Sequence, residues 1–191
     1  MIPRLLVERP MTPGEAAVWT TSAEQAQAAA FGNERRRCEF LTWRALVRRE
    51  LGRPVRIGYN AVGAPILPDG EAFISVAHCD GRVALCLSKH PCAVDIEPAT
   101  RDFSRVSDRY MTASEHLLST DPLWPGYVWC AKETLYKLSG RRGLDLREDL
   151  RIVSADLAAG RILGRIAFGD PLTLSAACLD GFLVVSFLQD C

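Results

Sequence analysis

The sequence lacks the features that mark membrane, secreted and general nucleic-acid-binding proteins. No apolar run approaches the roughly 20 residues that a membrane-spanning helix needs, and the first residues, MIPRLLVERP, contain no long apolar region of a signal peptide. Its 23 Lys and Arg balance its 23 Asp and Glu, so bulk charge argues against nucleic-acid binding. The seven cysteines form no Cys-x-x-Cys pair, which argues against a zinc site or a disulfide framework. We therefore expect a reduced, cytoplasmic protein.

The hydrophobic pattern predicts an α+β fold made of two similar halves. Helical periodicity covers residues 21–31, 33–52, 112–119 and 123–140, whereas residues 72–78, 82–88, 93–97, 149–168 and 171–188 have the pattern of strands and turns. Helices therefore precede strands twice, and AHCDGRVALCLS is echoed by AACLDGFLVVSF. We expect two α/β halves, residues 1–90 and 91–191, packed as a pseudo-dimer.

Two carboxylates interrupt the buried strand pattern at residues 92–97. Asp95 and Glu97 are two positions apart, so both side chains point to the same face of the strand. Like charges this close repel each other, and an Mg²⁺ ion between them would resolve the repulsion because it prefers oxygen ligands. The alternative is that both carboxylates point outward at a sheet edge and pair with arginines.

Glu115 is a third candidate ligand with a competing interpretation. Thr112 and Glu115 have the spacing of a capping box, in which the glutamate satisfies a backbone N–H at a helix start. A carboxylate in that position can also turn one oxygen toward a metal, so both interpretations stay open.

The segment WCAKETLYK predicts a helix with two different faces. An apolar stripe is formed by Val128, Ala131, Leu135 and Leu138. Trp129, Glu133 and Lys137 follow each other at four-residue intervals on a neighbouring stripe. An exposed Glu–Lys pair explains this spacing, but the tryptophan favours partial burial. A partly buried Glu133 beside Lys132 and Lys137 is suited to proton transfer and to phosphate neutralisation.

Histidine and arginine supply candidate phosphate contacts in the first half. His78 ends a strand, where it either satisfies local hydrogen bonds or donates to a phosphate. The helix at 33–52 is rich in arginine, which is typical of a solvated face. Arg44 lies near its apolar side, however, and a charge there needs a partner.

Together these motifs resemble the 4′-phosphopantetheinyl transferases of the surfactin- and enterobactin-activating type. The family pattern runs from a basic helix through Gly-x-Pro, a strand ending in Ser-His, a Gly-x-Asp-x-Glu strand and a helix-start glutamate to Trp-x-x-Lys-Glu-x-x-x-Lys. The corresponding segments here are RRRCEFLTWRAL, GAPILP, SVAHC, AVDIE, TASE and WCAKETLYK. Three positions depart from the pattern: Ala64, Ala77 and Ala93 stand where the family has a basic residue, a serine and a glycine.

The resemblance implies Mg²⁺-dependent transfer of the phosphopantetheine arm of coenzyme A to a serine of an acyl or peptidyl carrier protein. Adenosine 3′,5′-bisphosphate would be the other product. The implied roles concern metal binding, proton abstraction and phosphate binding. The metal ligands would be Asp95, Glu97 and Glu115; the general base would be Glu133; the charge-neutralising lysines would be Lys132 and Lys137; and the coenzyme A phosphates would bind His78, Arg37 and Arg44.

Two other functions fit part of the pattern. A non-catalytic homologue that binds coenzyme A or a carrier protein is the main alternative, because Ala64 and Ala77 remove phosphate contacts. An unrelated Mg²⁺-dependent nucleotide hydrolase explains Asp95 and Glu97 but not the helix at 123–140. We expect a monomer that binds neither membranes nor nucleic acids.

Overall fold

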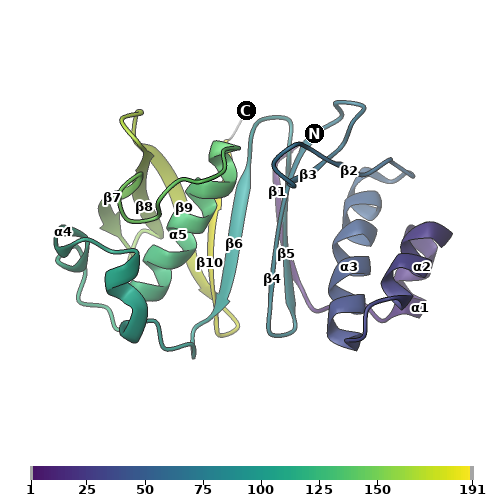
Figure 1. The fold of residues 1–191 in the computed structure, drawn as a ribbon, viewed down its shortest axis with the longest axis horizontal. Helices are drawn as coiled ribbons and strands as arrows, with labels where there is room; N and C mark the ends of the chain where they lie inside the picture. Colours follow the sequence, from purple (N-terminus) through teal and green to yellow (C-terminus); the bar gives the residue numbers. More distant parts are fainter. Residues whose placement is uncertain (1, 190–191) are drawn as a thin grey trace.

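The computed structural model describes residues 2–189, so Cys191 lies outside the described residues. The strands form two main sheets (Figure 1). The first sheet has the order β1-β5-β4 and consists of β1 (Arg4–Glu8), β4 (Phe73–Cys79) and β5 (Arg82–Ser88). The second has the order β6-β10-β9-β8-β7 and consists of β6 (Ala93–Pro98), β7 (Leu150–Asp156), β8 (Arg161–Ile166), β9 (Leu172–Leu179) and β10 (Phe182–Phe187). The boundary that we expect at residue 90 falls between the two sheets.

The helices lie outside the two sheets, each set beside the sheet of its own half (Figure 1). The first half contains α1 (Pro13–Ala16), η1 (Ala17–Trp19), α2 (Ser22–Ala29), α3 (Glu34–Leu51) and a small hairpin of β2 (Gly58–Tyr59) and β3 (Pro65–Ile66). The second contains η2 (Ser104–Arg109), α4 (Ala113–His116) and α5 (Trp124–Ser139). The α+β class expected from the sequence is thus confirmed.

Helix α3 forms where the sequence predicts it, because both of its ends are capped. The Asn33 side chain accepts a hydrogen bond from the backbone N–H of Arg36, and Gly52 ends the helix in the left-handed conformation, with φ 67°. Its inner face packs on the first sheet in an apolar cluster that includes Trp43, Leu46, Val47, Val83, Leu85 and Leu87.

Helix α5 packs against the second sheet through the expected apolar stripe. Val128, Ala131 and Leu135 are all 0% exposed, and Leu138 packs against the same cluster. The helix also lies along β6, the edge strand that carries Asp95 and Glu97. This packing sets the α5 side chains opposite the two carboxylates.

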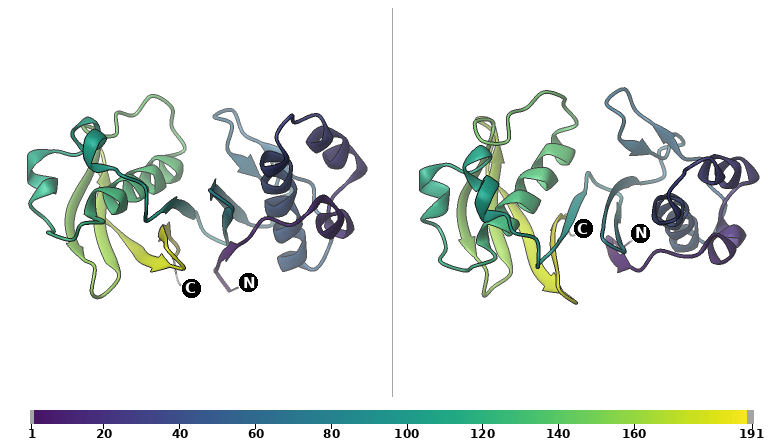
Figure 2. Two further views of the ribbon diagram at one scale, coloured as in Figure 1. Left: turned by 90° about the horizontal axis from the view of Figure 1, so that it is seen from below. Right: turned by 60° about the horizontal axis from the view of Figure 1, so that its bottom comes forward.

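The two halves meet where β4 and β6 lie side by side, in the middle of the molecule (Figures 1 and 2). The Ser75 hydroxyl accepts a hydrogen bond of 3.2 Å from the backbone N–H of Val94. A buried cluster joins β4 and β5 to β6 and β10; its members include Ala77, Ala84, Cys86, Val94, Ile96 and Val184. The pseudo-dimer arrangement of these halves stays a prediction.

The two Asp-Gly sequences of the internal echo both form hairpin turns. Asp80 and Gly81 have φ of 28° and 81°, and Asp180 and Gly181 have φ of 50° and 81°. Positive φ at both central positions matches the right-handed twist of the flanking strands, which explains the Asp-Gly pair. Each turn fixes the register of the hairpin that it closes.

Two elements differ from the sequence prediction. The helix expected over 112–119 is only the single turn of α4, which ends at His116. Strand β1 was not predicted, because a run of only three apolar residues between Arg4 and Glu8 gives no alternation. It is defined instead by antiparallel pairing with β5. Within residues 2–189, no helix has the length and apolar character needed to cross a membrane.

Candidate active site

Strand β6 presents Asp95 and Glu97 toward α5. Asp95 is 8% exposed, and its Oδ1 accepts a hydrogen bond of 2.7 Å from Nζ of Lys137. The same ammonium donates to the carbonyl oxygen of Val94 at 2.8 Å. Glu97 is paired with Arg101, whose Nη1 lies 2.6 Å from Oε1 of Glu97. Each carboxylate has a cationic partner, which supports the ion-pairing interpretation. Asp95 is nevertheless buried rather than outward-facing, which supports the interpretation as a cation site.

The second oxygen of Asp95 carries the main evidence for a cation site. Oδ2 is buried without a hydrogen-bond partner, a property shared among the described residues only by Oε2 of Glu71. Leaving a buried acceptor unsatisfied costs about 1–3 kcal/mol, and more for a charged group. Burial raises the pKa of Asp95, and Lys137 opposes that shift. A divalent cation would satisfy the free oxygen.

Glu133 is the third carboxylate of this region. Burial raises the pKa of Glu133, and the charges of Asp95 and Glu97 raise it further, while Lys137 lowers it. Burial also raises the pKa of Glu97, with Arg101 acting in the opposite direction. Within residues 2–189, Glu133 forms no ion pair, because Lys137 turns to Asp95. The ion pair between Glu133 and Lys137 that an exposed helix face would have is therefore not formed within these residues.

Glu115 is not brought together with Asp95 and Glu97. It is 1% exposed, and the expected capping box with Thr112 is present. Its Oε1 accepts a hydrogen bond of 2.7 Å from the backbone N–H of Ile152, and its Oε2 accepts one of 2.8 Å from that of Thr112. Over residues 2–189, no three Asp, Glu, His or Cys side chains are grouped to hold a metal ion, so the expected set of Asp95, Glu97 and Glu115 is not assembled.

Lys132 is the partner of Glu115 rather than of the carboxylates on β6. Its Nζ lies 2.8 Å from Oε1 of Glu115 and donates to the carbonyl oxygen of Tyr110 at 2.6 Å. The Lys132 side chain is 0% exposed, and burial lowers its pKa, whereas Glu115 raises it. Lys132 therefore anchors α5 to the segment that contains α4, away from solvent.

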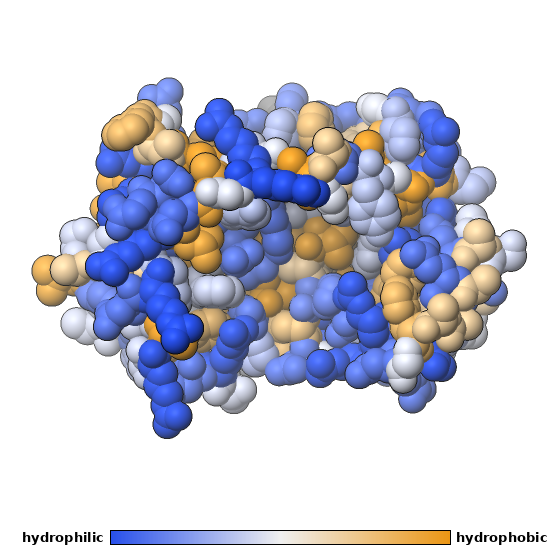
Figure 3. Space-filling view, in the orientation of Figure 1, coloured by the Kyte–Doolittle hydropathy of each residue, from blue (hydrophilic) through white to orange (hydrophobic). Residues whose placement is uncertain are grey.

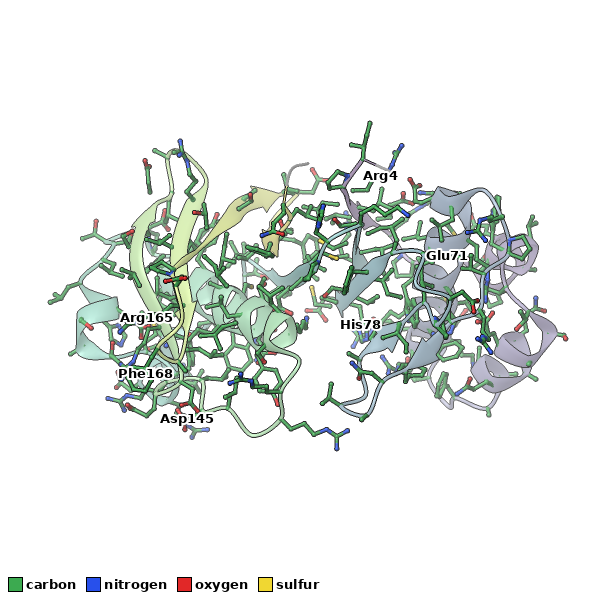
Figure 4. The ribbon with its side chains drawn as sticks, turned by 90° about the horizontal axis from the view of Figure 1, so that it is seen from above. Arg4, Glu71, His78, Asp145, Arg165 and Phe168 are labelled. Carbon is green, nitrogen blue, oxygen red and sulfur yellow. The ribbon has the colours of Figure 1, made fainter. Side chains whose placement is uncertain are left out.

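A cleft of about 770 Å³ lies beside Glu97, between the two halves. We call it the His78 cleft; its charged lining comprises Arg35, Arg36, Glu39, His78, Asp80, Glu97 and Arg101. Figure 4 shows His78 on the side of the first half that faces the second. The space-filling view shows the surface hollowed between the halves (Figure 3). Charges of both signs line this cleft.

The His78 ring is held by two charged residues of α3. Its Nδ1 lies 3.1 Å from Oε2 of Glu39, and its Nε2 lies 2.6 Å from Nη1 of Arg36. Burial lowers the pKa of His78, and Glu39 opposes that change. The sequence pattern predicted only a solvated basic face for Arg36 and did not single out Glu39, although their three-residue spacing places both on one face of the helix. His78 is therefore both locally satisfied and placed at a cleft.

Arg37 and Arg44 are engaged in the first half. Arg37 Nε donates to the carbonyl oxygen of Phe31 at 2.6 Å. Arg44 is 3% exposed; its Nε lies 3.5 Å from Oε1 of Glu24, and its guanidinium stacks over the Phe40 ring at 3.4 Å. Neither residue lines the His78 cleft. Arg44 thus has the partner that its position requires, and that partner is Glu24 rather than a cleft ligand.

These features define a site suited to phosphate chemistry. The unpaired, buried oxygen of Asp95 attracts a divalent cation, and Lys137 supplies positive charge beside it. The model of the 4′-phosphopantetheinyl transferase superfamily matches residues 91–176, which include β6 and α5. This match confirms the resemblance at the level of the superfamily over those residues, and it implies phosphopantetheinyl transfer in general. No curated protein matches the chain.

Proposed function

We propose that the protein is a Mg²⁺-dependent 4′-phosphopantetheinyl transferase of the surfactin- and enterobactin-activating type. The serine hydroxyl of an apo acyl or peptidyl carrier protein attacks the phosphorus that bears pantetheine. The bond from this phosphorus to the bridging oxygen breaks, and adenosine 3′,5′-bisphosphate leaves. The single observation that carries the proposal is the buried, partnerless Oδ2 of Asp95 within the segment that matches the superfamily.

Asp95 and Glu97 are the residues that would hold Mg²⁺. Mg²⁺ usually takes one or two protein carboxylates and completes its shell with phosphate oxygens and waters, so two ligands from β6 are sufficient. When bound, the ion would neutralise charge on the pyrophosphate of coenzyme A. Glu115 is left out of this set because Lys132, Thr112 and Ile152 already use its oxygens.

Glu133 is the proposed general base. A serine hydroxyl is a weak nucleophile near neutral pH and needs a neighbouring base. Glu133 faces the same region as Asp95 and Glu97, and its pKa is raised by burial and by those carboxylates, as a base acting near neutral pH requires. It would accept the serine proton directly or through a water molecule.

Lys137 and the His78 cleft supply positive charge around the substrate. Lys137 uses two hydrogen bonds on Asp95 and Val94, which leaves one N–H for a phosphate oxygen. His78 and Arg36 lie at the cleft next to Glu97 and would bind a phosphate oxygen there. Lys132 acts by fixing α5, the helix that positions both Glu133 and Lys137.

The decisive experiment is a mass measurement on a carrier protein. The purified chain is incubated with coenzyme A, Mg²⁺ and an apo carrier protein, and the carrier is weighed by mass spectrometry. Gain of one phosphopantetheine group, dependent on Mg²⁺, supports the proposal. Breakdown of coenzyme A without modification of the carrier would identify a hydrolase instead.

A non-catalytic homologue is the second candidate, favoured by the engagement of Arg44 with Glu24. A protein of this kind binds coenzyme A or a carrier without transfer. It predicts a calorimetric binding signal with an unchanged carrier mass. Monomeric state and cytoplasmic location belong to the same proposal, and sedimentation of the purified chain tests the first of them.

A further inference from the structure

The two carboxylates of β6 are paired with cations that are held in different ways. Lys137 is fixed on Asp95 and Val94 by two hydrogen bonds, and its side chain is 28% exposed. Arg101 contacts Glu97 through one hydrogen bond of 2.6 Å, and its side chain is 49% exposed. Within the part of the chain that the structure describes, the Arg101 guanidinium donates no other hydrogen bond. Of the two cations, Arg101 is therefore the one that is more easily displaced.

The ion pair of Arg101 and Glu97 lies where a cation would have to bind. Both residues line the His78 cleft, and the Glu97 side chain is only 14% exposed beneath its partner. Asp95, by contrast, keeps its Oδ2 without a hydrogen-bond partner. A divalent ion shared by the two carboxylates would lie next to the guanidinium, and two positive charges side by side repel each other. The proposed cation site is thus open on Asp95 but blocked on Glu97.

A second position for the Arg101 guanidinium lies beside the first. Its central carbon is 4.8 Å from the centre of the Phe103 ring and 5.7 Å from that of the Trp129 ring. Both distances are within the range of cation–π attraction, which does not depend on Glu97. Arg101 also lines a small pocket of about 130 Å³, together with Asp102 and Phe103. An arginine released from Glu97 can therefore stay on the aromatic rings and turn toward the Asp102 carboxylate.

The backbone around Arg101 is held by its own hydrogen bonds. The Arg101 N–H donates to the carbonyl oxygen of Pro98 at 3.1 Å, and the Ala99 N–H donates to that of Gly181 at 2.9 Å. Exposed side chains change rotamer within picoseconds to nanoseconds. Movement of the Arg101 side chain from Glu97 to the aromatic rings therefore requires no rearrangement of β6 or of the turn that follows it.

We propose that Arg101 competes with the divalent cation for Glu97 and moves onto Phe103 and Trp129 when the cation binds. This inference rests on the proposed function, since it takes Asp95 and Glu97 as the cation ligands. Before the cation binds, Arg101 compensates the charge of Glu97, and the affinity of the site for the cation is lowered by the strength of that pair. Afterwards, the guanidinium is free to donate to an anion in the His78 cleft.

The test measures metal affinity in the absence of coenzyme A and carrier protein. Mn²⁺ is the probe, because it takes the same oxygen ligands as Mg²⁺ and electron paramagnetic resonance separates its free and bound forms. Arg101→Gln should lower the Kd for Mn²⁺ about fivefold, the upper end for an exposed ion pair. In the Glu97→Gln background, the same substitution should change the Kd by less than about twofold, because no pair is left to break. Calorimetry with Mg²⁺ repeats the comparison with the proposed ion.

Arg36→Gln is the matched control, because Arg36 lines the same cleft but contacts His78 rather than a carboxylate of β6. It should leave the Kd within about twofold of the wild-type value. The proposal is overturned by equal tightening in Arg36→Gln and Arg101→Gln, by tightening that persists without Glu97, or by an unchanged or weaker affinity of Arg101→Gln. Absence of saturable binding in both the wild type and Arg101→Gln would refute the proposed cation site and this inference with it. Saturable binding without transfer to a carrier would refute only the proposed catalysis.

Discussion

Replacement of Lys132 by methionine should lower the stability of the fold and leave the proposed reacting groups in place. The Lys132 and Glu115 side chains are 0% and 1% exposed, so the variant leaves a carboxylate buried beside an apolar side chain. Breaking one partner of such a pair costs about 3–5 kcal/mol. For a chain of this size, that loss corresponds to a Tm lower by roughly 6–20 °C. Urea denaturation followed by circular dichroism measures the free energy of unfolding directly.

The double variant Lys132→Met/Glu115→Leu separates a lost charge partner from lost packing. Because it removes both charges, it should regain a large part of the stability that Lys132→Met loses. Lys137→Met is the matched control, since its side chain is 28% exposed and its removal should cost much less stability but more transfer activity. Normal stability of Lys132→Met together with the same loss of transfer as Lys137→Met would refute the anchoring role and restore Lys132 to the reaction.

Three other substitutions test the site and the first half. Asp95→Asn removes a buried carboxylate, so the free energy of unfolding without metal should stay equal or rise, whereas the increase in Tm that Mg²⁺ with coenzyme A gives the wild type should vanish; an undiminished increase would exclude Asp95 from the cation site. Glu133→Gln should lower kcat about 10²–10⁴-fold with little change in coenzyme A affinity, and a loss of affinity with normal kcat would make Glu133 a binding residue. Burial raises the pKa of Glu24, but Arg48 and Thr21 lower it by more, so the net pKa lies below 4.5. Its ion pair therefore stabilises the fold above pH 4.5 and loses that contribution as the pH falls through the lower, folded-state pKa, so the stability difference between wild type and Glu24→Gln should shrink on acidification; a difference that is constant with pH would contradict this.

Local signals made several helix ends predictable. The capping boxes at Thr21 and Thr112 and the glycine after Leu51 mark helix ends in the sequence, and each is present in the structure. Contacts between distant segments carry no such signal. Arg142 meets Val62 only because the two halves pack together, and strand β1 is identified by its pairing with β5. Sequence periodicity therefore located most helices and strands but not the contacts between segments that are far apart in the sequence.

The candidate site residues also divide into those that local sequence patterns place and those that only tertiary contacts place. Asp95 and Glu97 were paired correctly on one face because a strand alternates with period two. Glu115 was expected to join them, although its capping box already explained one of its oxygens. The buried ammonium of Lys132 uses the remaining hydrogen-bonding capacity of Glu115. This pairing could be recognised only from the tertiary structure.

Lys132 and Lys137 have different partners because of helix geometry. Successive residues of an α-helix are about 100° apart, so side chains five positions apart diverge by about 140°. Two lysines with this spacing cannot both face one pyrophosphate from a straight helix. In α5, Lys137 reaches Asp95, whereas Lys132 reaches Glu115 and the Tyr110 carbonyl on the other side. Glu133 lies four positions before Lys137, at about 40° from it, and so shares its face. The motif thus separates into a face that carries the proposed catalytic residues and a face that anchors α5, so we expect stability and transfer to depend on different lysines.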